Sequence, residues 1–322
     1  MRSRHTRQAL RAFLTTGVLS AGLFLTACAP AHDAESLFAQ MHSDDAEARQ
    51  DASETLDTIL KNGDYRVFVR GVSSPNQMYR VQSILFLARM SQPEARAALR
   101  DLLKVEARSL LPYNPIRLKP SSEMTDSRIL VAHLIAEGGG DPEAVGVLLR
   151  GVGEDQPAEV LSGTCFALGA LRDPKGIPFL VTAAHHPDSE VVRAAVQAAG
   201  RFHEPEALAV FRVAASNPTP EVRIDAVTSL TFQEGPGALE FLRTLAASDP
   251  SPAVRALAIR QMERFKDTSV VPFLISQLGS ADQQLRGAAY DVLQRLTGQS
   301  MPPRLEAWSR WWARNGARAA IH

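Results

Sequence analysis

The side chains that do chemistry are sparse in this sequence of 322 residues, and their spacing indicates no catalytic site. His185 and His186 could bind a metal ion together with His203 if a turn brought the three rings close. Neighbouring histidines near turns are usually solvated, so we predict no metal site. The three glycines at 138–140 precede Asp-Pro and are typical of a helix end and restart, not of a phosphate loop. We therefore expect no enzyme and no cofactor, although a catalytic triad need not be local in sequence.

Cys28 is the first of two cysteines, and it follows a segment that looks like a processing signal. An apolar run from Ala12 to Thr26, about fifteen residues, is shorter than the roughly 20 that a membrane span needs. It follows a basic start made by Arg2, Arg4, Arg7 and Arg11. The run ends in Leu25-Thr26-Ala27-Cys28, which resembles the lipobox of bacterial lipoproteins.

That resemblance implies that residues 1–27 are a signal peptide and that lipid is attached to the thiol and amine of Cys28. Several acyl chains together anchor a protein stably. Residues 28–40 would then form a short tether and the first helix. Ala29 is not the aspartate that implies retention at the inner membrane in enterobacterial lipoproteins, so we expect the outer membrane, facing the periplasm. The alternative is an ordinary signal peptide or anchor with an incidental cysteine.

The mature chain would be slightly acidic. Residues 1–27 hold four of the 35 basic residues and no acidic residue, which leaves 31 against 35 and a net charge of −4. Phosphate binding favours a strong basic excess, so nucleic acid is not an expected partner. With Cys28 lipidated, Cys165 has no cysteine to pair with, and its apolar neighbours predict a small buried side chain.

A repeat of about 31 residues organises the rest of the chain. Four arginines lie 30, 32 and 31 residues apart, and each follows a short polar turn typical of a helix start: Arg193, Arg223, Arg255 and Arg286. The same register extends back through Leu161, Arg128, Arg80 and Arg49. We call these eight residues the marked positions of the repeat. Small or apolar residues stand three positions after each, and mostly large apolar ones stand seven positions after, which predicts eight helices with one buried stripe. A shorter amphipathic helix is expected between successive members.

This pattern resembles the HEAT repeat, and its length with a Val-Arg-x-x-Ala core is similar to the subclass first recognised in phycobilisome lyases. The resemblance covers roughly residues 40–298. It implies an all-α fold, a right-handed α-α superhelix of about eight helical hairpins over residues 41–298. No run alternates with period two over the length of a strand, so no sheet is expected.

In the family, a turn aspartate and the inner-helix arginine form a ladder of hydrogen bonds between neighbouring repeats. Carried over, the resemblance implies two pairs, Asp188 with Arg193 and Asp249 with Arg255. Weaker matches are Asn217 with Arg223 and Asp282 with Arg286. These residues, with Arg49, Arg80 and Arg128, would be structural. Leu161 replaces the arginine in the fourth unit, so the ladder should be interrupted there.

Arg80 and Arg128 are 48 residues apart, so an insertion lies between them, and composition places it at residues 105–122. Its three prolines exclude a continuous helix. Its apolar residues suit contact with something: Leu110, Leu111, Tyr113, Ile116 and Leu118. Insertions in solenoids often map to the binding face. The loop packs on the nearest helices or contacts a partner; the sequence leaves both open.

The inner helices of units two to four are unusually apolar. Five residues after the marked position, where we expect an outward side chain, they carry Leu85, His133 and Phe166. The later units carry Ala198, Thr228, Arg260 and Asp291 there. A helix that is apolar all round is normally covered. We hypothesise that the 105–122 loop and a bound protein share the concave surface of units two to four.

The C-terminal segment, residues 299–322, is rich in tryptophan. Trp308, Trp311 and Trp312 have helical spacing on one face. A terminal repeat needs a cap with a polar outer side, and the interleaved arginines suit one. The alternative is a platform for a sugar or a peptide.

Two enzyme classes use related scaffolds. Deoxyhypusine hydroxylases hold two irons with several His-Glu pairs, whereas this sequence has one such pair, His203-Glu204. Phycobilin lyases share only the repeat, and an exported lipoprotein is in the wrong compartment for them. We therefore predict a non-catalytic scaffold in the cell envelope, with another envelope protein or peptide as partner and lipid as its membrane contact. The alternative is a HEAT-like enzyme or metal-binding protein that uses His133, His185 or His203.

Overall fold

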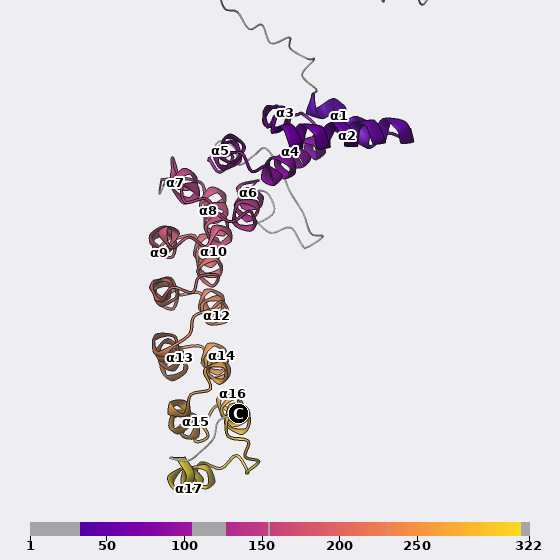
Figure 1. Ribbon diagram of the computed structural model, residues 1–322. Coiled ribbons are helices and arrows are strands. Elements are labelled where there is room, and N and C mark those ends of the chain that lie inside the picture. Colours follow the sequence, from indigo (N-terminus) through magenta and orange to yellow (C-terminus); the bar gives the residue numbers. More distant parts are fainter. Residues whose placement is uncertain (1–32, 105–126, 154, 231, 317–322) are drawn as a thin grey trace, which may run out of the picture. The chain divides into compact units, whose positions relative to one another are not determined.

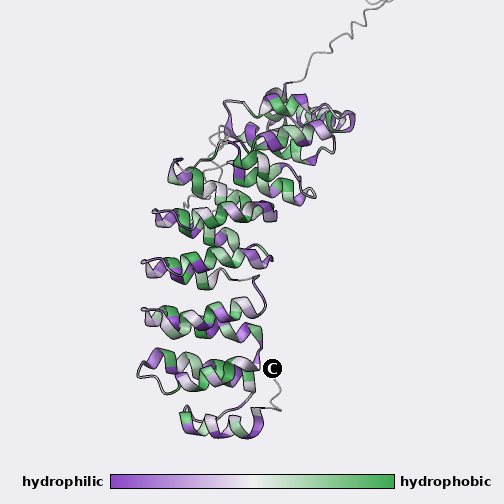
Figure 2. Ribbon diagram, turned by 90° about the vertical axis from the view of Figure 1, so that its left-hand side faces the viewer, coloured by the Kyte–Doolittle hydropathy of each residue, from purple (hydrophilic) through white to green (hydrophobic). Residues whose placement is uncertain are grey.

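The computed structural model describes residues 33–104, 127–153, 155–230 and 232–316. Helices, turns and bends make up these ranges, and no strand occurs within them. The helices form an outer and an inner row that alternate along the chain (Figure 1). Each outer helix packs against the inner helix that follows it. Figure 2 shows the resulting hairpins as successive layers.

The outer helices are mostly short. They are α1 (Ala34–Met41), α3 (Arg66–Gly71), α5 (Pro93–Asp101), α7 (Ala144–Leu149), α9 (Ile177–Ala183), α11 (Leu208–Ala214), α13 (Pro236–Ser248) and α15 (Val271–Gln277). The inner helices are α2 (Ala46–Asn62), α4 (Gln77–Arg89), α6 (Ser127–Glu137), α8 (Ala158–Leu171), α10 (Ser189–Ala199), α12 (Pro220–Thr228), α14 (Pro252–Met262) and α16 (Gln283–Thr297). From α4 to α16, each inner helix contacts the next one. The expected all-α stack of helical hairpins is confirmed.

Side-chain caps start many of these helices. The cap accepts a hydrogen bond from the backbone N–H two residues on in α2, α4, α10 and α16, at Asp45, Asn76, Asp188 and Asp282. Pro220 and Pro252 begin α12 and α14 instead, where a missing N–H costs nothing. Helices α2 and α16 end at Gly63 and Gly298, whose φ of 72° and 66° favours glycine.

The buried stripe lies where the repeat predicts it. The residue three positions after each marked position is fully buried in all eight inner helices: Ala52, Ser83, Val131, Thr164, Val196, Ala226, Ala258 and Ala289. The residue seven positions after is buried as well, from Leu56 in α2 to Leu293 in α16. The eight predicted helices and their inward face are therefore present.

The closest approach between inner helices is made by glycines. A Cβ on Gly169 of α8 would lie 2.9 Å from the Cα of Ala198 in α10. A Cβ on Gly200, just after α10, would lie 2.3 Å from the carbonyl oxygen of Ser229. Ala198 is consequently buried. The expectation that the fifth position after the marked one looks outward is wrong in this unit, because the neighbouring helix comes so near.

The arginines of the repeat hold their own turns. Arg Nη1 donates to the carbonyl oxygen six residues earlier over 2.7–2.9 Å in five pairs: Arg49–Ser43, Arg80–Ser74, Arg223–Asn217, Arg255–Asp249 and Arg286–Ser280. The side chain of the same turn residue accepts the N–H two residues further on, at Asp45, Asn76, Thr219, Ser251 and Asp282. One residue thus joins the turn, the helix start and the arginine.

Arginines also join neighbouring units. Arg223 Nε and Nη2 donate to the two carboxylate oxygens of Asp249 over 2.8 and 3.0 Å, and both side chains are almost fully buried. This hydrogen bonding raises the pKa of Arg223. Arg128, fully buried, donates from Nη2 to the carbonyl of Val160 in the next unit over 3.0 Å.

The partners differ from those implied by the family resemblance. Arg193 pairs with Asp225 of the next inner helix over 2.6 Å and with Glu190, while Asp188 caps α10. The implied pair of Asp188 with Arg193 is therefore wrong. It fails because the aspartate that the arginine reaches lies on the following helix.

Two further implied pairs are changed. Arg255 bonds to the backbone carbonyl of Asp249, because the carboxylate of Asp249 is used by Arg223. Asp282 caps α16 and lies 3.8 Å from Arg255, whereas Arg286 bonds to turn carbonyls.

The helix α17 (Leu305–Asn315) follows the last hairpin and packs against α15. Trp308 is fully buried, lies edge-on to Tyr290 with ring centroids 6.4 Å apart, and donates from Nε1 to the carbonyl of Pro302 over 3.1 Å. Trp311 and Trp312 are half-buried against the same core. Of the two interpretations of the tryptophans, the cap accounts for these contacts.

We expect Arg223→Met to destabilise the protein by about 3–5 kcal/mol, because it leaves the buried carboxylate of Asp249 without its countercharge. The measurement is the urea unfolding midpoint followed by circular dichroism. Arg295→Met is the control, since its pair with Glu263 is half-exposed and is worth about 0–1 kcal/mol. Equal effects of the two substitutions would contradict the structural role of the buried pair.

Candidate binding surface

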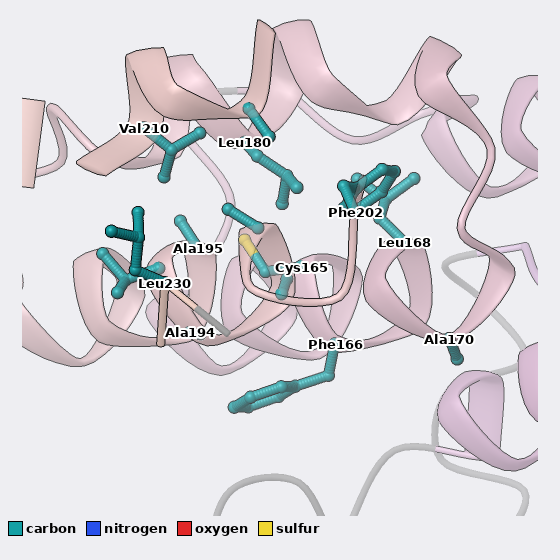
Figure 3. Packing of buried hydrophobic residues seen from close by; sticks show 14 of the residues in the cluster. Cys165, Phe166, Leu168, Ala170, Leu180, Ala194, Ala195, Phe202, Val210 and Leu230 are labelled. Atoms are coloured by element: carbon teal, nitrogen blue, oxygen red, sulfur yellow. The ribbon is translucent and has the colours of Figure 1, made fainter. Parts of the chain in front are cut away.

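The inner helices α4, α6 and α8 carry the three residues singled out for partner binding. Leu85 on α4 is 39% exposed, His133 on α6 is half-buried, and Phe166 on α8 is only 9% exposed. Figure 3 shows Phe166 pointing away from the core cluster around Cys165, on the other side of α8. Leu85 is the most accessible of the three.

An exposed apolar stripe follows one face of α4. Met78 is 54% exposed, and Leu85 lies seven residues later on the same face, with half-buried Val81 between them. Beside the stripe, the amide nitrogen Nε2 of Gln82 lies within hydrogen-bond distance, 3.0 Å, of the ring nitrogen Nε2 of His42. This hydrogen bond joins the end of α1 to α4, the helix that carries the stripe.

Helix α8 is apolar all round for a reason that the sequence hypothesis did not include. Eleven of its fourteen residues, from Val160 to Ala170, are buried in succession. It packs against α6 on one side and α10 on the other, with α7 and α9 of the outer row also in contact. Neighbouring helices of both rows therefore pack against α8.

Positive charge lies near His133. Burial lowers the pKa of His133, and the guanidinium groups of Arg201 and Arg172 lower it further, while Glu137 opposes them. Arg172 caps the end of α8 in a left-handed conformation with φ 53°. The ends of α8 and α10 thus place two cations close to the inner face of α6.

The remaining predicted residues are placed as follows. Leu110, Leu111, Tyr113 and Ile116 lie outside the described residues, as does Cys28. The ring of His203 lies tilted against exposed Phe232, with ring centroids 4.9 Å apart, and His185 bonds to the carbonyl of Val181. Among the described residues, no group of three or more His, Cys, Asp or Glu side chains is arranged to hold a metal ion. Nor does any described helix have the length and apolarity of a membrane span.

A second series of contacts between units was missed by the sequence reasoning. It lies at the ends of the inner helices. Buried Gln233 donates to the carbonyls of Phe202 and Glu204, Arg264 donates to the carbonyl of Gln233, and Arg295 pairs with Glu263. The partners in this series lie about one repeat apart. The signal available in the sequence was the recurrence of Arg264 and Arg295 with a spacing of 31, in register with the first ladder.

The family model for HEAT repeats matches this chain over residues 120–199, 177–250 and 239–321. These matches cover more than half of the chain, and they coincide with the hairpins from α6 to α17. The chain therefore belongs to the HEAT-repeat family.

No curated protein matches the sequence. Among solved structures, human deoxyhypusine hydroxylase in complex with glycerol is 17% identical with a TM-score of 0.33, covering 80% of this chain and 92% of that one. The complex of CpcE and CpcF of phycocyanin lyase from Nostoc sp. PCC7120 is 16% identical with a TM-score of 0.33, covering 92% and 99%. At these values the two likenesses say nothing about activity.

We expect His133 to make the protein less stable in mild acid. Its pKa is lowered in the folded state, so below about pH 6.5 the unfolded chain binds a proton that the folded chain does not. The stability associated with neutral His133 is therefore lost as the pH falls from about 6.5 toward the lowered value. Urea midpoints at pH 7.5 and 5.5 should fall more for the parent protein than for His133→Gln. An equal fall in both would contradict this assignment.

Proposed function

We propose that this chain is a non-catalytic, protein- or peptide-binding scaffold that lipid anchors to the bacterial cell envelope. The observation that carries the proposal is the exposed apolar stripe of Met78 and Leu85 on an inner helix of a HEAT stack. Single exposed hydrophobic residues are ordinary on protein surfaces, but two on one face of one helix form a patch. Stacked repeats create extended surfaces that bind other chains.

The contact surface is the inner face of α4, continued by α6 and α8. Leu85 supplies exposed apolar area, Phe166 a small accessible aromatic area, and His133 a polar group in a positive setting. A partner that lays an apolar helix or strand on α4 would bury Met78 and Leu85. The partner is another envelope protein or peptide, since a mature net charge of −4 does not suit nucleic acid.

The anchor rests on the N-terminal sequence. A basic start, a short apolar run and Leu-Thr-Ala-Cys are the features that support lipid on Cys28 and a location at the outer membrane, facing the periplasm. The lipid would hold the stack at the membrane, while the helices bind in the aqueous compartment. The rival function, a HEAT-like enzyme or metal-binding protein, would show bound metal in the purified chain.

We expect Cys28→Ala to move the protein from the membrane fraction to the soluble fraction, because no acyl chain can then be attached. The measurement is fractionation of cells that express the full chain, with metabolic labelling by a fatty acid as a second readout. Cys165→Ala is the control, since the buried thiol of Cys165 should have no part in anchoring. A Cys28→Ala protein that stays in the membrane would count against lipidation.

We expect a photo-crosslinking amino acid at Leu85 to capture a partner in native membranes, because this side chain would be covered in the complex. The same probe at Val69 should capture none: Val69 is equally exposed, at 39%, but lies on outer helix α3. Leu85→Glu should weaken capture from a probe at Met78 by about tenfold without lowering the melting temperature. Capture that is as strong from Val69 as from Leu85 would refute the inner face as the binding surface.

A further inference from the structure

Two equivalent cavities lie between successive outer helices of the stack, beside the turns. One, between α11 and α13, has a volume of about 550 Å³, and the other, at α9, about 560 Å³. Seven of the nine residues that line the second cavity correspond to lining residues of the first at a separation of two repeats, 62 residues. The corresponding pairs include Leu161 and Arg223, Phe179 and Phe241, Thr182 and Thr244, and His186 and Ser248.

The two cavities differ at the arginine position of the repeat, which is part of the lining of both. In the first, Arg223 bonds to Asp249, and its charge is satisfied by that pair. In the second, hereafter the Leu161 pocket, the arginine is replaced by Leu161, which is buried, and the aspartate position is taken by Pro187. Phe179 and Val152 complete an apolar lining. The two cavities are alike in volume, and the substitution that interrupts the ladder gives one of them an apolar floor.

Two histidines at the Leu161 pocket have defined hydrogen-bonding roles. His185 Nδ1 lies 2.9 Å from the carbonyl oxygen of Val181, so this nitrogen carries the proton and donates. His186 Nδ1 accepts the backbone N–H of Asp188 over 3.0 Å, so this nitrogen is unprotonated. In the neutral rings, the remaining nitrogen of His185 is therefore an acceptor, and that of His186 is a donor.

We propose that the Leu161 pocket binds one bulky apolar side chain of an extended peptide, with the peptide groups beside it bonded to His185 and His186. A peptide group offers one N–H and one carbonyl, which match an acceptor and a donor at the same rim. The apolar floor receives the side chain. This site lies on the outer row, so it stands whether or not the inner face of α4 binds a partner.

The test uses the full chain and N-acetyl-L-leucine methylamide, which carries one apolar side chain between two peptide groups. Ligand-detected NMR should give a dissociation constant on the order of millimolar, as expected for so small a molecule. Thr182→Phe, which fills the pocket, should weaken binding by about tenfold. His185→Phe, which removes the acceptor, should weaken it by about threefold or more.

Thr244→Phe is the matched control. Thr182 and Thr244 are both exposed, both bond to the carbonyl four residues earlier, and both line an equivalent cavity. Binding should be unchanged in Thr244→Phe. The proposal is overturned if Thr244→Phe weakens binding as much as Thr182→Phe, or if N-acetyl-L-alanine methylamide binds as tightly as the leucine probe. It is also overturned if isobutanol, which lacks peptide groups, binds the parent protein as tightly as the leucine probe does and binds His185→Phe equally well.

Discussion

One hydrogen bond recurs in five of the eight hairpins, from an inner-helix arginine to the carbonyl six residues earlier. A sharp turn between two short helices leaves backbone N–H and C=O groups without partners inside the helices. Hydrogen bonds to water would satisfy these groups without holding the turn in one conformation. The arginine satisfies one such carbonyl, and the turn residue's side chain satisfies a nearby N–H. This arrangement ties the turn to the start of the inner helix in those five hairpins, where the arginine recurs with the length of the unit. Its other nitrogens remain available to the next unit, as Arg223 shows with Asp249.

Once the turns are fixed, small buried residues decide how near the units lie. The fully buried third position admits Ala, Ser, Thr or Val, and the glycines at 169 and 200 let backbones meet at van der Waals distance. Apolar burial then supplies most of the stability, since short helices are marginal alone. The inner face of α4 is different, because Met78 and Leu85 stay in contact with solvent.

The sequence predicted the eight inner helices and their buried stripe, because both follow from a period that is local to each helix. It failed where the answer depends on a neighbouring helix. Arg193 pairs with Asp225 on α12 and not with Asp188 in its own turn. The spacing of residues in the sequence does not tell which of these two carboxylates the arginine contacts. Ala198 is buried because α8 approaches α10 closely at Gly169, and Phe166 is only 9% exposed although its position indicated an outward side chain. The donor and acceptor roles of His185 and His186 depend on hydrogen bonds to backbone groups, which the three-dimensional fold decides.

The replacement at Leu161 also makes the joints of the stack chemically unequal. In the described part of the chain, ion pairs join α10 to α12 and reach from α12 and α14 into the following turns, whereas none joins α8 to α10, which meet through apolar and small residues. Carboxylate pairs weaken when acid protonates the aspartates, while apolar contacts weaken on cooling because their burial carries a large heat-capacity change. Acid and cold therefore loosen different joints of the same array.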